Sequence, residues 1–596
     1  MRKILTKMVS AILCAALALT VLPATYVRAE ETTKTRSQLY AEAMGAGINL
    51  GNTFDAFDRV NHSEIDDETA WGNPIVTQAY MNDIKAKGYD SIRIPFTAFT
   101  RTGEAEAYTI TESYLERYET VVNYALNADL YVMVNLHHDS SEWLNAWDGE
   151  KTSAEYKRFC ALWEQLAERF KNYGDKVMFE SINEVYFLEG DENSQNEKVK
   201  TLSNAFYDIV RNSGGENETR MLVFPTTSTN HNLVYSNFLA NYLKGLNDEN
   251  VMATVHYYST ELYAYTVNCG VSIFDETYNG KTARSTIDDF YSCLETAFVD
   301  NGIGVVVGEY GLFNMGYKDA LEEGEVVKFV DYMNYCARKL GGINLMLWEC
   351  GNIIDRNTFE YTNQTWGNAF SACMTERCSY ATGLDEVFVT VDEVDADIEI
   401  PLTLNGNTLQ GIYNGTQQLT EGTDYTYENN TVTIKGVYVS KLPKEQYGEI
   451  TDLTFKFSAG ADWHEKINFV GDAPVFENVS ATVREDDGYM SYYDTDGTAT
   501  YPVVIIPVDY QGKKVRRITS YDSSGNVEHA NSWASIYLQD GGEFIANYVN
   551  NELLLMNWYN NAITDDTYKL VIEFYDGTSA EYSLTRQGNQ FTGSQL

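Results

Sequence analysis

The chain has 596 residues, of which 44% are hydrophobic and 13% are aromatic. It carries 43 lysines and arginines against 86 aspartates and glutamates, a formal net charge of −43. This charge repels phosphate backbones, anionic lipids and acidic polysaccharides, so we expect no nucleic-acid and no membrane partner. A neutral polymer is not disfavoured.

The first 29 residues predict a cleaved secretory signal peptide (residues 1–29). Arg2, Lys3 and Lys7 precede an apolar stretch that is broken by Pro23, and the segment closes on small residues at Ala29. The stretch is short for a membrane span, and no comparable run follows it. We therefore expect a secreted, extracellular protein.

Residues 30–384 predict a (β/α)8 TIM barrel, a fold of the α/β class. Eight apolar runs with strand character alternate with longer stretches of helical periodicity, which is typical of parallel βα units. The runs are Gly47–Phe54, Ser91–Phe96, Leu130–His138, Val177–Glu184, Met221–Pro225, Val251–Tyr258, Gly304–Glu309 and Ile343–Glu349.

Residues 385–596 follow a different pattern. Short alternating strands and turn signals such as Asn429-Asn430 replace the helical periods. We expect two all-β domains, an immunoglobulin-like β-sandwich at 385–471 and a second β-sandwich at 472–596, with strands near 501–508, 533–538 and 568–575. No Pro/Thr/Ser-rich linker separates the blocks, so we expect a monomer whose three parts pack as one rigid body.

The cysteines fit no metal-ligand spacing. All of the 8 except Cys14 lie between Cys160 and Cys378, and the pair Cys373-x₄-Cys378 alone is too little for zinc. We expect no metal and no cofactor. For the thiols two alternatives stay open: a local disulfide between Cys373 and Cys378, or reduced cysteines throughout.

Polar or aromatic side chains stand at the C-terminal tips of nearly all the predicted strands. In a parallel barrel these tips meet at one face, which is where active sites are built. Each residue alone has an ordinary structural explanation, but core packing does not require the whole set. Its members are Asn49, Asn52, Arg93, His137, His138, Asn183, Glu184, His256, Tyr258, Glu309 and Trp348. The two glutamates suggest an acid and a nucleophile.

Several motifs carry a specific resemblance. They include Gly47-Ile-Asn-Leu-Gly-Asn-Thr-Phe-Asp, Trp71-Gly-Asn-Pro, Ile92-Arg-Ile-Pro, Asn135-Leu-His-His-Asp, Ser181-Ile-Asn-Glu, Val255-His-Tyr-Tyr and Val307-Gly-Glu-Tyr-Gly. Through them, residues 35–375 resemble glycoside hydrolase family 5, and most of all its subfamily 4 of bacterial endo-β-1,4-glucanases and xyloglucanases.

The resemblance implies a role for each residue of the set. Glu184 would be the acid/base and Glu309 the nucleophile, with opposite pKa requirements: Glu309 ionised and Glu184 protonated at the start of the cycle. Arg93 and Tyr258 would hold Glu309 ionised, and His256 would tune Glu184. Of the substrate-binding residues, Asn183 would bind the sugar 2-hydroxyl and Trp348 would stack on the ring. Asn52, His137 and His138 complete the substrate-binding set.

The C-terminal part resembles two known modules. Leu402-Thr-Leu-Asn-Gly-Asn and Gly411-Ile-Tyr-Asn-Gly are similar to the immunoglobulin-like X2 module, and the last block is similar to carbohydrate-binding module family 46. Trp533 and Trp558, with Tyr559, are candidates for a surface that stacks on sugars. Core packing explains each of the two tryptophans at least as well.

Together these features predict a secreted retaining endo-β-1,4-glucanase that hydrolyses cellulose, mixed-linkage glucan or xyloglucan. Three departures from the family pattern leave the substrate preference open: Val185 stands for the usual proline, Trp348-Glu-Cys-Gly for Trp-Asp-Asn-Gly, and Ser259–Tyr263 for an aromatic loop. The alternatives are a β-mannanase and a non-catalytic glycan-binding surface protein with a degenerate barrel.

Overall fold

The computed structural model describes residues 34–58, 67–258, 273–277, 280–312, 323–482, 503–530 and 536–596. The predicted signal peptide lies outside these residues, as do Trp533 and Ser259–Tyr263. No helix in the described ranges is both long and apolar enough to cross a membrane.

The N-terminal part is a closed parallel barrel, as the alternating pattern predicted. Its strands pair in chain order, and β1 closes the barrel against β8. The strands are β1 (Ala46–Asn49), β2 (Ser91–Ile94), β3 (Tyr131–Asn135), β4 (Val177–Glu180), β5 (Leu222–Pro225), β6 (Val251–Tyr257), β7 (Gly304–Tyr310) and β8 (Ile343–Leu347).

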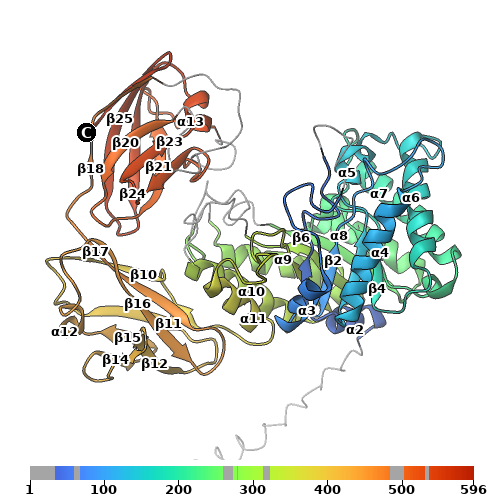
Figure 1. Cartoon of the computed structure of the whole chain (residues 1–596), viewed down its shortest axis with the longest axis horizontal. Helices are drawn as coiled ribbons and strands as arrows, with labels where there is room; N and C mark the ends of the chain where they lie inside the picture. The colour runs from blue at the N-terminus through green and yellow to red at the C-terminus, as the bar shows by residue number, and fades with distance from the viewer. Residues whose placement is uncertain are drawn as a thin grey trace, which may run out of the picture.

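Amphipathic helices surround the barrel (Figure 1). They are α3 (Gln78–Ala86), α4 (Glu112–Asn127), α6 (Ala154–Phe170), α7 (Glu192–Asn212), α8 (Leu233–Leu246), α9 (Ala283–Ala297), α10 (Glu323–Leu340) and α11 (Gln364–Cys373), with the short α5 (Asp139–Glu142). Side-chain hydrogen bonds cap the N-termini of several of these helices. Asp191 accepts from the Ser194 amide before α7, and Thr282 and Ser285 form a capping box before α9.

The barrel interior is filled by flexible apolar side chains rather than by charges. The cluster contains Val223, Val306 and methionines from β3, β4, β6 and β8, together with Met221 directly before β5. Helix α2 (Arg36–Ala43) adds Tyr40 and Ala41 to the same cluster and contacts β7 and β8. Unbranched methionine fits irregular gaps of this kind. The packed interior leaves the chemistry to the strand tips.

The second module is a β-sandwich. One sheet has the order β10-β17-β16-β12-β13 and the other β14-β15-β11-β9. The strands are β9 (Tyr380–Ala381), β10 (Glu386–Thr390), β11 (Ile398–Thr403), β12 (Leu409–Asn414), β13 (Gln417–Gln418), β14 (Tyr425–Glu428), β15 (Thr431–Ile434), β16 (Gly448–Phe457) and β17 (Trp463–Val470), with helix α12 (Gly436–Val439). Strand β9 pairs with β11 although it precedes the expected boundary at 384.

The turn between β14 and β15 follows its sequence signal. Asn429 and Asn430 have φ values of 52° and 61°, the left-handed conformation that asparagine tolerates and that a tight hairpin needs. Here local chemistry alone fixed the structure.

The third module is a separate β-sandwich with its own apolar core. Its sheets have the orders β18-β20-β23-β22 and β19-β26-β25-β24-β21. The strands are β18 (Val475–Phe476), β19 (Val479–Thr482), β20 (Val504–Asp509), β21 (Val515–Tyr521), β22 (Phe544–Asn547), β23 (Glu552–Leu555), β24 (Thr567–Phe574), β25 (Ser579–Gln587) and β26 (Gln590–Gln595), with helix α13 (Asn557–Ala562).

One predicted strand of this module is wrong. Residues 536–538, the described part of the expected strand 533–538, are irregular. Two hydrogen bonds hold the backbone there instead. The Leu538 amide donates to the Ile518 carbonyl at 2.8 Å, and the Gln539 amide donates to the buried Glu543 carboxylate at 2.8 Å. The Glu543 side chain, four residues after Gln539, took the place of a strand partner.

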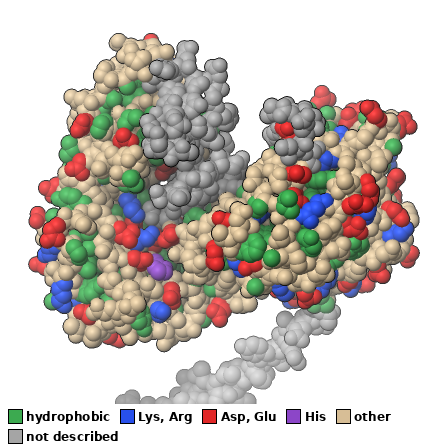
Figure 2. All heavy atoms as spheres, in the orientation of Figure 1, with side chains coloured by type: hydrophobic (Ala, Val, Ile, Leu, Met, Phe, Trp, Pro, Cys, Tyr) green, Lys and Arg blue, Asp and Glu red, His purple; other side chains and the backbone are tan. Residues whose placement is uncertain are grey.

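The modules contact each other in two ways. The barrel and the second module share one apolar cluster, in which Trp463 is 1% exposed. The third module is joined by ion pairs: Lys514 to Glu386 at 2.6 Å, and both Arg516 and Arg517 to Glu276 of the barrel. In Figure 1 the second and third modules lie one above the other beside the barrel, and Figure 2 shows acidic side chains scattered over this face of the molecule.

Candidate active site

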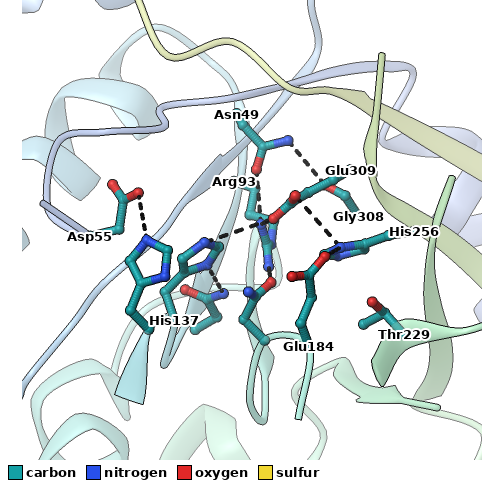
Figure 3. A network of polar contacts seen from close by, with 12 residues as sticks. Asn49, Asp55, Arg93, His137, Glu184, Thr229, His256, Gly308 and Glu309 are labelled. Carbon is teal, nitrogen blue, oxygen red and sulfur yellow. Dashed lines mark hydrogen bonds and ion pairs between the residues drawn. The ribbon is translucent and has the colours of Figure 1, made fainter. Parts of the chain in front are cut away.

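The predicted side chains converge at the C-terminal end of the barrel (Figure 3). Arg93 comes from β2, Glu184 follows β4, His256 and Glu309 come from β6 and β7, and Tyr258 directly follows β6. The strand ends meet here because parallel strands all point the same way around the barrel. Residues far apart in the chain thus form one polar cluster.

Glu309 is held from several sides in a buried position. Arg93 Nη1 donates to its Oε1 at 2.8 Å and the Tyr258 hydroxyl donates to its Oε2 at 2.9 Å. Its side chain is 7% exposed. Burial raises the pKa of Glu309, against the lowering effects of the His256 and Arg93 charges and with a further increase from Glu184.

Arg93 is shared between two carboxylates. Besides Glu309 it binds Glu180, whose Oε2 accepts from Nε at 2.8 Å, and it donates to Asn49 and Asn183 at 3.0 and 2.7 Å. Burial would lower the pKa of Arg93, but the two carboxylates raise it, so it stays charged. Because one cation serves two anions, Glu309 receives only part of its charge.

Glu184 is the more accessible carboxylate, with 45% of its side chain exposed. Its Oε1 lies 2.8 Å from His256 Nδ1, which is also 3.6 Å from Glu309 Oε2. Burial would raise the pKa of Glu184, but the hydrogen bond and charge of His256 lower it. Burial would likewise lower the pKa of His256, but Glu309 and Glu184 raise it. The two carboxylates therefore favour the protonated form of the imidazole that lies between them.

This order of pKa values corrects the expectation from the sequence. Glu309 was expected to be the readily ionised group and Glu184 the protonated one, but burial raises the pKa of Glu309 while His256 lowers that of Glu184. The reason is tertiary. The sequence does not show that Arg93 also pairs with the buried Glu180.

The remaining predicted residues line the same end of the barrel. The Trp348 ring is stacked on His137, with centroids 5.7 Å apart and planes at 9°. Burial, with the neighbouring cationic groups, holds the pKa of His137 well below its usual value, so it faces Glu309 as a neutral ring at 3.8 Å. His138 lies against Trp71 and 3.6 Å from Asp55, whose carboxylate accepts from the Asn52 amide at 3.0 Å.

Several supporting residues were missed by the sequence reasoning. The buried Glu180 and Asn135 bond each other beneath Arg93 at 2.8 Å, and a charge inside the apolar run Val177–Glu184 was a signal for a buried partner. Behind Trp348, Glu349 pairs with Arg356 at 2.9 Å with both side chains buried. The unusual Glu349, two residues after β8, marked this pair, but its partner could not be found from local sequence.

The candidate sugar-stacking residues of the third module separate into two kinds. Tyr559 is fully buried, and its hydroxyl is 2.7 Å from Ser520, so it belongs to the core. Trp558 is half-buried on α13 and packs beside Gly542. Trp533 lies outside the described residues.

Three groups of potential metal ligands occur among the described residues, each with three donor atoms within 4.8 Å of one another. Asp55, His137 and His138 form one, Glu184, His256 and Glu309 another, and Asp331, Cys373 and Cys378 the third. The carboxylates of Asp55, Glu309 and Asp331 are already used by protein donors. None of the groups is a complete four-ligand site made of protein atoms alone.

A closed parallel barrel with two carboxylates, an arginine and a tryptophan at its C-terminal face defines the class of glycoside hydrolases, in which paired carboxylic acids cleave the glycosidic bond. Comparison with known protein families identifies the family within this class. Residues 51–353 match the model of cellulase, glycosyl hydrolase family 5, and the chain belongs to this family. Residues 384–467 match carbohydrate binding domain X2, and residues 491–594 match a further carbohydrate binding domain.

Similar proteins share this three-part organisation. Endoglucanase B of Paenibacillus lautus is 34% identical over 566 residues, which cover 94% of this chain and 93% of the relative. The tri-modular endo-β-1,4-glucanase B of Bacillus halodurans matches with a TM-score of 0.84 at 32% identity, over 95% of this chain and 100% of that one. A trimodular GH5_4 subfamily endoglucanase matches with a TM-score of 0.85 at 33% identity, over 94% and 100%. The chain is an enzyme of the endoglucanase type, so the non-catalytic alternative is dropped.

Proposed function

We propose that this enzyme is an exported endo-β-1,4-glucanase that hydrolyses neutral plant-cell-wall glucans with retention of configuration, using Glu309 as nucleophile and Glu184 as acid/base. One observation carries the mechanism. An oxygen of Glu184 and an oxygen of Glu309 lie within 4.8 Å of each other. Retaining glycosidases need their carboxyl groups about 5 Å apart, whereas inverting enzymes need about 6.5–9.5 Å to admit a water.

In this proposal the reaction begins with proton transfer from the Glu184–His256 pair. With a proton on His256 Nδ1, 2.8 Å from Glu184 Oε1, Glu184 takes this proton and donates it to the glycosidic oxygen as the bond to the anomeric carbon breaks. Glu309 then bonds the anomeric carbon. Ester formation removes the Glu309 charge that raises the pKa of His256. Having lost its proton to the leaving group, the pair stays deprotonated, so Glu184 can act as the base that takes a proton from the attacking water.

The substrate class follows from charge and from the cleft. A chain with a net charge of −43 favours an uncharged polymer over an acidic one. Trp348, held flat against His137, offers an aromatic face of the kind that stacks on sugar rings. Cellulose chains, mixed-linkage glucan and xyloglucan meet both conditions. β-Mannan differs from these glucans at the sugar 2-hydroxyl, so the experiment below includes mannan as the alternative substrate.

The deciding experiment measures hydrolysis by the purified full-length enzyme on hydroxyethylcellulose, mixed-linkage β-glucan, xyloglucan and mannan. Product sizing separates endo from exo action, and the anomeric form of the first product, followed by proton NMR, reports retention or inversion. Retained configuration with mid-chain cleavage of a β-glucan is expected. Inverted products would overturn the nucleophile assignment, and mannan as the best substrate would make the enzyme a β-mannanase.

We further infer that the third module extends the substrate cleft. Glu276, which anchors both Arg516 and Arg517, lies between β6 and α9 in the chain, on the side of the barrel where the catalytic strand ends open. The same arginines sit on β21 of the third module. A module fixed at this position can hold a glucan chain that continues past the barrel, with Trp558 as the candidate ring.

A further inference from the structure

The junction between the barrel and the second module contains two cysteine side chains in contact. Cys373 ends α11, Cys378 follows five residues later, and both are fully buried. Their Sγ atoms are 3.4 Å apart. The other described cysteines, Cys160, Cys293, Cys336 and Cys350, are half-buried and free. Among described residues this is therefore the cysteine pair that can react with itself.

The backbone on both sides of the pair is already fixed. Asp331 of α10 accepts from the Cys378 amide at 2.8 Å and forms an ion pair with Arg377 at 2.7 Å. Arg338 donates to the Cys373 carbonyl and, at 2.7 Å, to that of Glu376. Because the loop between the two cysteines is short and held at both ends, joining the sulfurs costs little further chain entropy.

Loops of the second module cover the pair. Asn405 donates to the Cys378 carbonyl at 2.7 Å and Asn407 to the Arg377 carbonyl at 2.9 Å. The Ala461 amide donates to Cys378 Sγ at 3.4 Å. The segment 373–378 is therefore the place where the chain leaves the barrel and the second module closes over it.

We propose that Cys373 and Cys378 form a disulfide bond that fastens the end of α11 to the start of the second module. In this reaction two S–H bonds break and one S–S bond forms. Two protons leave to solvent, and the two electrons pass to a disulfide oxidant, which is reduced to its dithiol. Cys378 is the attacking sulfur, since the Cys373 thiol 3.4 Å away hydrogen-bonds to it and stabilises its thiolate. The bond forms before the loops of the second module cover the sulfurs.

A metal ion is the competing occupant of the same group. Asp331 would have to be its third ligand, but both of its oxygens are taken by Arg377 and the Cys378 amide. A structural zinc ion needs four ligands, and its thiolates are fully deprotonated. The donor set therefore favours the disulfide over the ion.

The test maps the thiols of the full-length protein. One sample is secreted by the expression host into the medium, and a matched sample is made in a reducing cytoplasm. Each is unfolded with alkylating reagent and no reductant, digested, and its peptides are weighed. In the secreted sample Cys373 and Cys378 should be unalkylated and joined, two hydrogens lighter than the dithiol, while Cys160 and Cys336 are alkylated. The cytoplasmic sample should show all of these thiols alkylated.

Two variants sharpen the result. Cys336→Ser should leave the link intact, and Cys373→Ser should make Cys378 available to the reagent. Free, alkylated Cys373 and Cys378 in the secreted wild-type protein would overturn the proposal, and so would protection of both thiols by added Zn²⁺ with no loss of hydrogen. Because the mapping uses the wild-type chain, a variant that fails to fold does not blur the answer, and activity plays no part in it.

Discussion

Two regions of this enzyme bury carboxylates with too few cations to match, and they solve the problem differently. In the cleft, Glu180, Glu184 and Glu309 share Arg93 and His256. At the junction of the barrel with the second module, Glu325, Asp385 and Glu465 share Lys328 and Lys466. In the cleft the excess charge stays on groups that can reach a ligand.

At the junction the excess is removed by a proton instead. Burial raises the pKa of Glu465 well above its usual value, and Trp463 Nε1 is its one described hydrogen-bond donor, at 2.8 Å. The difference lies in access to solvent and ligand, because the Glu184 side chain in the cleft is 45% exposed whereas Glu465 is buried. Cleft substitutions should then change activity more than stability, and junction substitutions the reverse.

The largest effect is expected for Glu184→Gln and Glu309→Gln. Each removes one half of a two-carboxylate displacement, so turnover should fall by about 10³-fold or more while thermal unfolding is unchanged or raised. Initial rates on a soluble β-glucan measure the turnover, and calorimetry measures the thermal unfolding. Azide should partly restore Glu309→Gly and Glu184→Gly with opposite anomeric products. A Gln variant with near-wild-type turnover contradicts the assignment.

Arg93→Met should harm catalysis through the nucleophile. Without the guanidinium the pKa of Glu309, already raised by burial, rises further, and since the reaction needs the ionised form, the acidic limb of the pH profile moves to higher pH. The expected loss near neutral pH is about 10²-fold. The profile of kcat against pH is the measurement.

The matched control is Lys328→Met at the junction. Its Nζ is 2.6 Å from the buried Glu325 carboxylate, and breaking such a pair costs about 3–5 kcal/mol of unfolding free energy. kcat and the shape of the pH profile should stay as in the wild type. If Arg93→Met instead raised KM with an unshifted profile, Arg93 would be a structural residue like Lys328.

Arg356→Met tests a buried pair that lies behind the cleft. Arg356 bonds Glu349 at 2.9 Å, the Gly51 carbonyl at 2.8 Å and the Thr53 hydroxyl at 2.5 Å, so it ties the loop after β1 to the tip of β8 that carries Trp348. Loosening both loops should raise KM by about 10-fold with a smaller change in kcat. Arg356→Lys should reverse only part of this rise in KM, because lysine cannot make the forked contacts of the guanidinium. An equal loss in kcat and kcat/KM would show a role in the chemical step.

Removal of residues 472–596 tests whether the third module belongs with the cleft. Among the described residues it forms ion pairs with Glu276 of the barrel, and its core is separate, so the remaining chain should fold. kcat/KM should fall by several-fold on long glucans and little on short oligosaccharides. Glu276→Ala, which removes only the anchor, should give a weaker form of the same pattern. Equal losses on both substrate lengths, or weaker adhesion to insoluble polymer alone, would favour a tethered anchor.

The smallest effect on the enzyme is expected for Glu465→Gln, which should increase the free energy of unfolding. Because burial raises the pKa of Glu465 in the folded state well above the ordinary value of 4.5, the wild-type chain loses stability as pH rises from that value toward the folded pKa. Glutamine keeps the acceptor for Trp463 without the proton. The variant's advantage should grow by about 1.4 kcal/mol per pH unit above the unfolded pKa, up to the folded one. Denaturant unfolding at several pH values measures it, and a constant difference would show that Glu465 is ionised in the fold.

Much of the molecule could be predicted from the sequence because the signals are local. Strand and helix periods placed the barrel, the Asn429-Asn430 pair placed a hairpin, and the strand tips brought Arg93 to Glu309 and His256 to Glu184. These inferences work because a parallel barrel collects its strand ends at one face whatever lies between them in the chain.

Only the tertiary structure decided how charge is shared. It paired Arg93 with Glu180 as well as Glu309, reversed the expected pKa order of the two catalytic candidates, and joined Glu349 to Arg356. It also buried Tyr559 and held residues 536–538 in an irregular segment, in which the Leu538 amide bonds the Ile518 carbonyl. Desolvation and ion pairing depend on neighbours that are distant in sequence, so the chain's local pattern identifies the reacting groups, and the packing around them sets their protonation.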